Sequence, residues 1–194
     1  MRVRNLAVAA AAGISIAVVA GPVSSQESYN IDPQHSQPMF EVSHMGFSLQ
    51  RGNFSGATGK ITLDRAAKKG TIDVTVDTRT VRTSDPTLDT RVRGEDFFNV
   101  ATYPTMTFKS SQLSFDGDRL VGADGELTML GITKPVKLTV ANFVCGSHPY
   151  TKNPMCGAEV STTIKRSEWG MKYLAPRMVG DEVKITIPVE AYRG

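Results

Sequence analysis

The sequence predicts an all-β protein, an antiparallel barrel of about eight strands with one or two short helices. Apolar and polar residues alternate with period two in several runs, which is typical of strands with one buried face. Short turn-forming segments separate these runs, as in an antiparallel meander. Antiparallel sheets of this size avoid exposed edges by closing into a barrel.

The alternation locates the strands. It is clearest near the C-terminus, where Val183, Ile185 and Ile187 alternate with Lys184 and Thr186. Similar patterns predict strands at residues 61–63, 72–76, 106–108, 127–129 and 136–140, with further strands near 39–42 and 158–164.

Turn chemistry predicts where the strands end. Asp-Gly tolerates positive φ, so residues 116–118 (DGD) are expected to form a hairpin turn. Turns are also expected at residues 68–70 (KKG), 123–125 (ADG) and 131–135 (GITKP). Asp85 followed by Pro86 predicts a helix start, with Asp as N-cap and Pro in the first helical position. A second helical piece is expected at 166–171.

Residues 1–25 have the layout of a secretory signal peptide. Arg2 and Arg4 precede an uncharged run of 15 residues, 6–20, which is short for a membrane span of ~20 residues. Cleavage after Ser25 is preferred, and cleavage after Ala20 is the alternative. The predicted organisation is therefore a leader, 1–25, and one barrel domain, 26–194, located in the periplasm or secreted.

Charge and hydropathy exclude two classes of partner. Without residues 1–25 the chain has 20 Lys and Arg against 19 Asp and Glu, so nothing indicates a nucleic-acid footprint. No later segment is apolar for long enough to cross a bilayer.

The two cysteines, Cys145 and Cys156, predict one disulfide in an exported chain, worth roughly 3 kcal/mol in the chain-entropy model. The rival interpretation, a metal site with His148, lacks a fourth ligand and the usual paired spacing.

Five segments together resemble the YceI-like family over roughly residues 29–192. They are residues 35–47 (HSQPMFEVSHMGF), 51–54 (RGNF), 96–104 (DFFNVATYP), 125–136 (GELTMLGITKPV) and 166–171 (RSEWGM). The resemblance implies a lipocalin-like eight-stranded barrel, periplasmic or secreted, that binds a polyisoprenoid or another long-chain amphiphile. It implies no catalytic chemistry, metal or cofactor, and some members are dimers, so a homodimer is a possible state.

The chain departs from the family pattern in two places. The helix before residues 96–98 usually carries a His-Leu-basic-Ser string, whereas residues 91–94 here read RVRG. Arg91 is the residue expected to meet an anionic head group in its place. The insertion between Cys145 and Cys156 is not a general family feature, and a lid at the barrel mouth is one interpretation of it.

An eight-stranded barrel is either filled by its own side chains or wide enough for one small ligand. Met-rich and Phe-rich interiors adapt to varied apolar ligands. With the resemblance, the sequence favours a long isoprenoid or fatty-acyl chain held inside. The side chains expected to contact this lipid are Phe40, His44, Met45, Phe47, Phe54, Leu88, Arg91, Phe97, Phe98, Met106, Phe108, Met129, Leu138 and Trp169.

Two other functions remain open from the sequence. One is a filled barrel that acts through its surface. The other is an enzyme acting on a lipid or quinone with His35 or His44 as acid or base. The second is disfavoured because no partner for the base is visible, and a metal site is disfavoured because no carboxylate or further His completes a ligand set at a recognisable spacing. Arg79, Arg82 and Arg93 join Arg91 as candidates for a phosphate group, although each alone is more typical of a solvated face.

Overall fold

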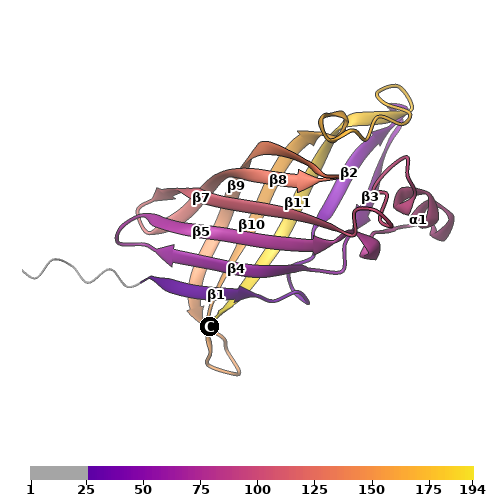
Figure 1. Cartoon of the computed structure of the whole chain (residues 1–194). Coiled ribbons are helices and arrows are strands. Elements are labelled where there is room, and N and C mark those ends of the chain that lie inside the picture. Colours follow the sequence, from indigo (N-terminus) through magenta and orange to yellow (C-terminus); the bar gives the residue numbers. More distant parts are fainter. Residues whose placement is uncertain (1–25) are drawn as a thin grey trace, which may run out of the picture.

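The computed structural model describes residues 26–194 and forms a closed antiparallel barrel with one short α-helix (Figure 1). Its strands are β1 (Glu27–Ile31), β2 (Met39–His44), β3 (Ser48–Asn53), β4 (Ala57–Asp64), β5 (Lys69–Asp77), β6 (Arg82–Thr83), β7 (Thr105–Asp116), β8 (Arg119–Met129), β9 (Ile132–Ser147), β10 (Pro154–Lys165) and β11 (Val179–Arg193). The helix α1 covers Pro86–Arg93. The predicted signal peptide lies outside the described residues.

Eight strands close the barrel in the order β1-β4-β5-β7-β8-β9-β10-β11, and β11 pairs back onto β1. The remaining strands, β2, β3 and β6, extend from the other half of β11. The C-terminal end of β11 pairs with β1 at Tyr29–Arg193, whereas Val183 pairs with Val42 of β2. β1 and β2 therefore lie one after the other along β11, so the predicted eight-stranded barrel is confirmed and carries three extra strands.

The Asp-Gly hairpin is confirmed, because Gly117 takes a φ of 59° between β7 and β8. The turn expected at residues 123–125 is wrong, since these residues lie inside β8. A bulge in β7 faces them, where the Ser110 hydroxyl donates to the Asp124 carbonyl at 2.6 Å. The Phe108 ring covers Gly125 so closely that a Cβ there would lie 2.5 Å from the ring. Glycine in this strand therefore marks a close approach and not a turn.

Two other boundaries differ from expectation. The turn after β8 is Leu130-Gly131, with φ of 52° and 72°, and residues 132–135 already belong to β9. The second helical piece is a single 3₁₀ turn, Arg166–Trp169, that ends at Gly170 in the left-handed region. The helix at Asp85-Pro86 forms as predicted, because Asp85 accepts a hydrogen bond from the Thr87 amide at 2.8 Å.

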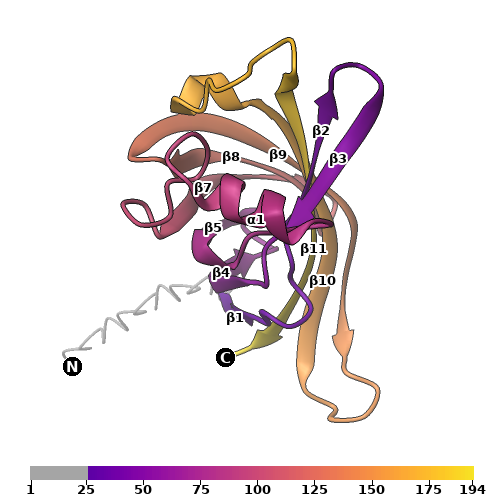
Figure 2. The ribbon, with the colours of Figure 1, turned by 90° about the vertical axis from the view of Figure 1, so that its right-hand side faces the viewer.

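The disulfide between Cys145 and Cys156 is confirmed. The two residues are direct partners across β9 and β10, with Cα atoms 4.0 Å apart. The Nδ1 of His148 accepts from the amides of Tyr150 and Thr151 at 3.2 and 3.1 Å. The loop between the cysteines projects away from the barrel at the end opposite α1 (Figures 1 and 2), so it is not folded over the mouth as a lid.

Candidate functional site

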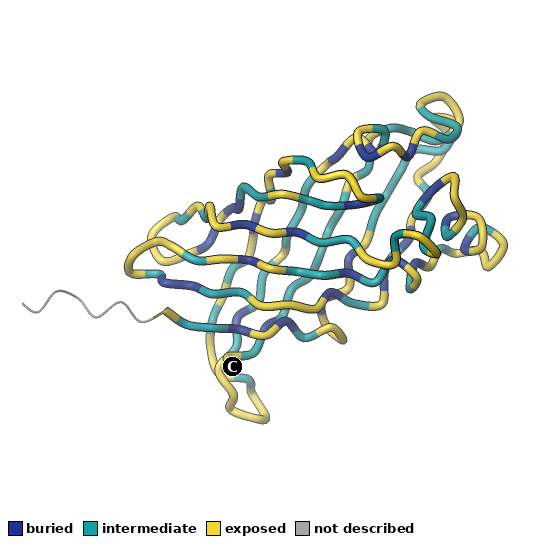
Figure 3. The backbone as a smooth tube through the Cα atoms, viewed as in Figure 1, coloured by how far each residue is buried: buried dark blue, intermediate teal, exposed yellow. Residues whose placement is uncertain are grey.

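The barrel interior is a cavity and not a filled core. It has a volume of about 460 Å³, within the range of roughly 300–1,000 Å³ that small-molecule sites occupy. Every strand of the barrel contributes to its lining, through alternate residues such as Ile72, Val74 and Val76 of β5. Figure 3 shows how buried, intermediate and exposed residues follow one another along the strands. The lining is overwhelmingly apolar, so the cavity suits a long hydrocarbon.

Most residues that the sequence singled out meet in this cavity. Those that line it are Phe40, His44, Phe54, Leu88, Arg91, Phe97, Phe98, Met106, Phe108, Met129 and Leu138. Three do not. Met45 and Phe47 lie on the tip of the β2–β3 hairpin, where Phe47 is 90% exposed. Trp169 is buried beside the barrel wall, with its indole Nε1 donating to the Leu127 carbonyl at 3.1 Å.

A cluster of three aromatic rings forms the wall beneath α1. The centroids of Phe54 and Phe98 are 5.4 Å apart in an edge-to-face arrangement, and Phe40 lies 6.0 Å from Phe54. Gly52 on the adjacent strand leaves room for this packing, because a Cβ there would lie 2.3 Å from the Phe40 ring. A side chain at position 52 would therefore clash with the Phe40 ring and disturb the packing of the cluster.

The helix α1 and the segment after it cover this end of the barrel (Figure 2). Leu88 and Arg91 line the cavity from the helix, and the Phe97 ring packs edge-on against Tyr173 at 5.8 Å. The carboxylate of the buried Asp89 fixes the helix by accepting from the Thr83 hydroxyl at 2.8 Å.

The arginines near α1 differ in what they contact. Arg79 forms two hydrogen bonds to Asp77, at 2.9 and 2.7 Å. Arg82 and Arg93 lie 3.8 and 3.7 Å from Asp89. Only Arg91 of the four lines the cavity, where its guanidinium lies over the Tyr173 ring at 5.9 Å. Of the four arginines, Arg91 is thus the one whose side chain reaches the cavity.

The comparisons with known proteins agree with this geometry. The sequence pattern of a family described as the YceI-like domain matches residues 29–191. The chain belongs to the YceI-like family. The protein YceI of Escherichia coli O157:H7 is 36% identical over 168 residues, which cover 84% of this chain and 85% of the relative.

Solved structures share the YceI-like barrel. BcnA of Burkholderia cenocepacia has a TM-score of 0.68 at 24% identity, and the match covers 82% of this chain and 98% of BcnA. A domain from Saccharophagus degradans, described as polyisoprenoid binding, has a TM-score of 0.65 at 18% identity. The match covers 87% of this chain and 99% of that domain. At these identities the two likenesses establish the fold alone.

Sequence reasoning missed part of the lining of this YceI-like barrel. Arg166 was noted only within a motif, yet it lines the cavity and is 3% exposed. Leu174 lines it from the segment that follows the 3₁₀ turn, which leads into Val179, the first residue of β11 and also part of the lining. No alternation marks this segment, because it is an irregular loop and its side chains are positioned by the hydrogen bonds of Arg166.

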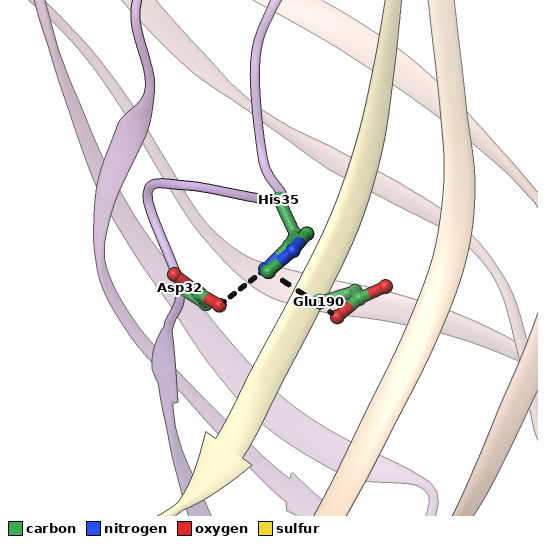
Figure 4. A group of neighbouring side chains, drawn as sticks. All are labelled: Asp32, His35 and Glu190. Carbon is green, nitrogen blue, oxygen red and sulfur yellow. Dashed lines mark hydrogen bonds and ion pairs between the residues drawn. The ribbon is translucent and has the colours of Figure 1, made fainter. Parts of the chain in front are cut away.

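His35 lies outside the cavity of the YceI-like barrel, in a group of three potential metal ligands. Figure 4 shows Asp32 and His35 on the loop after β1 and Glu190 on β11. The His35 Nδ1 lies 2.7 Å from Asp32 and 3.9 Å from Glu190. Asp32 and Glu190 are therefore carboxylate neighbours of His35 that the sequence pattern did not reveal. The three ligand atoms lie within 4.8 Å of one another, so this outer face has the donors for a divalent cation.

The stability contributed by His35 is expected to depend on pH. The hydrogen bond to Asp32 raises the pKa of His35 above its ordinary 6.5, and the same bond lowers the pKa of Asp32 below 3.8. A histidine whose pKa is raised in the folded state stabilises the fold fully at a pH below 6.5, and this stabilisation is lost as the pH rises through the raised pKa. The stability that Asp32 contributes is lost only when the pH falls through the lowered pKa of its carboxyl group.

The thermal midpoint of the native protein is therefore expected to exceed that of His35→Ala by more at about pH 5.5 than at about pH 8.5. Melting both proteins across this range by circular dichroism measures the difference. If the difference in thermal midpoint between the two proteins were the same at every pH, the pair of His35 with Asp32 would make no pH-dependent contribution to stability.

Proposed function

We propose that this protein is a carrier that holds one long apolar lipid, an isoprenoid or a fatty-acyl chain, inside its barrel. The cavity of about 460 Å³ is the observation that supports this function, since a barrel of this size need not contain one. Burial of an alkyl chain contributes about 0.8 kcal/mol per CH₂ group. A chain of tens of carbons therefore offsets the cost of association. The fold shared with the Saccharophagus degradans domain supports the same ligand class.

The charges of the lining orient the proposed ligand. Its arginines, Arg51, Arg91 and Arg166, come from β3, α1 and the 3₁₀ turn, and His44 comes from the end of β2. Arg51 binds Glu41 and Arg166 binds backbone carbonyls, so Arg91 is the arginine that we expect to meet the head group. The opposite stretch is lined by Phe143 and Ala191 together with Tyr29. The hydrocarbon tail is thus expected to run toward β1, with an anionic or polar head beneath α1.

The proposed setting is the periplasm or another exported location. The sequence features of residues 1–25 support export, and the disulfide fits an oxidising compartment. In the described part of the chain, no helix has the length and apolar character of a membrane span. A protein of this kind would transport, store or sequester its lipid between membranes.

The alternative functions receive less support. A barrel plugged by its own side chains does not agree with the cavity. An enzyme would need an acid or base beside the bound lipid with a partner to orient it. The carboxylate partners of His35 lie on the outer face, whereas His44 is the histidine that lines the cavity.

Purification without detergent, followed by organic extraction and mass spectrometry, tests the carrier proposal. We expect about one long-chain lipid per protein molecule, because the cavity is continuous. Protein that yields no lipid, and that takes up none when incubated with isoprenoid alcohols or fatty acids, would contradict the proposal.

A further inference from the structure

Four exposed apolar side chains, Met45, Phe47, Leu49 and Met178, gather at one end of the barrel, and we name them the apolar tip. Their exposed fractions are 45, 90, 52 and 47%. Two segments carry them, the β2–β3 hairpin and the loop before β11. The Met45 amide donates to the Met178 carbonyl at 2.9 Å, so the segments are joined. Phe47, in particular, contributes almost its whole ring to the surface.

The charges beside the apolar tip have one sign. Residues 43–50 and 171–179 contain no Asp or Glu, but they include the exposed Lys172 and Arg177. Within residues 26–194, neither of these cations forms an ion pair. Outside these two segments, Glu41 binds Arg51 at 2.7 Å and Asp181 accepts from the Ser167 hydroxyl at 2.8 Å, while the exposed Glu182 lies further along β11. The two segments that carry the apolar tip are therefore apolar and positive.

The apolar tip lies at the end of the barrel to which the proposed head-group site belongs. Ser43, His44, Leu174 and Val179, at the bases of the two segments, line the cavity. Figure 2 shows the β2–β3 hairpin and the loop before β11 at the same end, and the disulfide loop at the other. A lipid that entered between these segments would pass the apolar tip first.

We propose that the apolar tip docks on the surface of an anionic phospholipid bilayer. Phe47 would insert among the acyl chains, and Lys172 and Arg177 would meet the lipid phosphates. An aromatic ring on a hairpin loses its contact with water on insertion, and long basic side chains reach the phosphate layer. The proposal rests on the carrier function, since docking at this end would bring the cavity to the source of its lipid.

Co-sedimentation with phosphatidylcholine vesicles, with or without phosphatidylglycerol, tests the docking. We expect Phe47→Ser to weaken vesicle binding about tenfold, because most of the insertion energy comes from this ring. Tyr150→Ser is the matched control, since Tyr150 is 88% exposed on the disulfide loop at the opposite end. It should bind like the native protein. Arg177→Gln should weaken binding to anionic vesicles about fivefold and leave binding to neutral vesicles unchanged.

The measurement separates docking from lipid content. Because Phe47 and Arg177 do not line the cavity, their variants should retain extractable lipid. Native protein that binds vesicles but neither yields nor takes up lipid would refute the carrier function and leave the docking intact. Equal vesicle binding by native protein, Phe47→Ser and Tyr150→Ser would overturn the docking. A dimer that Phe47→Ser dissociates without changing vesicle binding would also overturn it, because the apolar tip would then be a subunit interface.

Discussion

Arg166→Ala is expected to destabilise the protein by about 3–5 kcal/mol. Arg166 is 3% exposed, and its guanidinium donates to four backbone carbonyls, those of Met171, Tyr173, Val179 and Gly180, at 2.8–3.0 Å. Alanine leaves these carbonyls without their donor in a site that water enters poorly. Urea unfolding at equilibrium, followed by circular dichroism, measures the loss as a lower midpoint.

Two further variants distinguish the role of Arg166 from a general effect of lost charge. Arg119→Ala removes an exposed guanidinium that pairs with Asp116 at 2.6 Å, and it should cost at most about 1 kcal/mol. Arg166→Lys keeps the charge, but an ammonium cannot reproduce the planar set of donors, so an intermediate loss is expected. If Arg166→Ala and Arg119→Ala unfolded at the same urea concentration, the carbonyl network would not stabilise the fold.

The hydrogen bonds of Arg166 explain why the sequence predicts the strands of the barrel better than the loop at its mouth. Strand periodicity depends on neighbours two residues apart, so the alternation in β5 and β11 directly predicts which side chains face inward. The loop at 170–178 has no such period. Its course depends on one arginine that reaches carbonyls up to 14 residues away. Phe47 illustrates the same limit, since the sequence predicts that it contacts the lipid, whereas its ring is exposed on the hairpin turn.

The errors at strand boundaries have a related cause. Residues 123–125 contain Asp and Gly, which favour turns in isolation. In the barrel, Gly125 instead makes space for the Phe108 ring, and Ala123 is fully buried opposite Leu138. Local propensity therefore yielded to packing.

The His35 group was missed because Glu190 is 155 positions away in sequence and reaches it only through the pairing of β1 with β11.

Leu138→Trp is expected to lower the lipid that co-purifies with the protein by about tenfold or more, because the larger side chain occupies volume that the ligand needs. Leu138 lines the cavity from the middle of β9. Mass spectrometry of the organic extract, normalised to protein, measures the loss. Because the indole enters empty space, the thermal midpoint should change little.

Thr139→Trp is the matched control, since the next residue of the same strand is exposed on the outer face. It adds the same indole outside the barrel and should leave the bound lipid unchanged. The pair also tests the cavity itself. In a barrel filled by its own side chains, Leu138→Trp would overpack the core and cost about 1–3 kcal/mol. Strong destabilisation by Leu138→Trp, in a native protein that yields no lipid, would therefore show a filled barrel and contradict the carrier function.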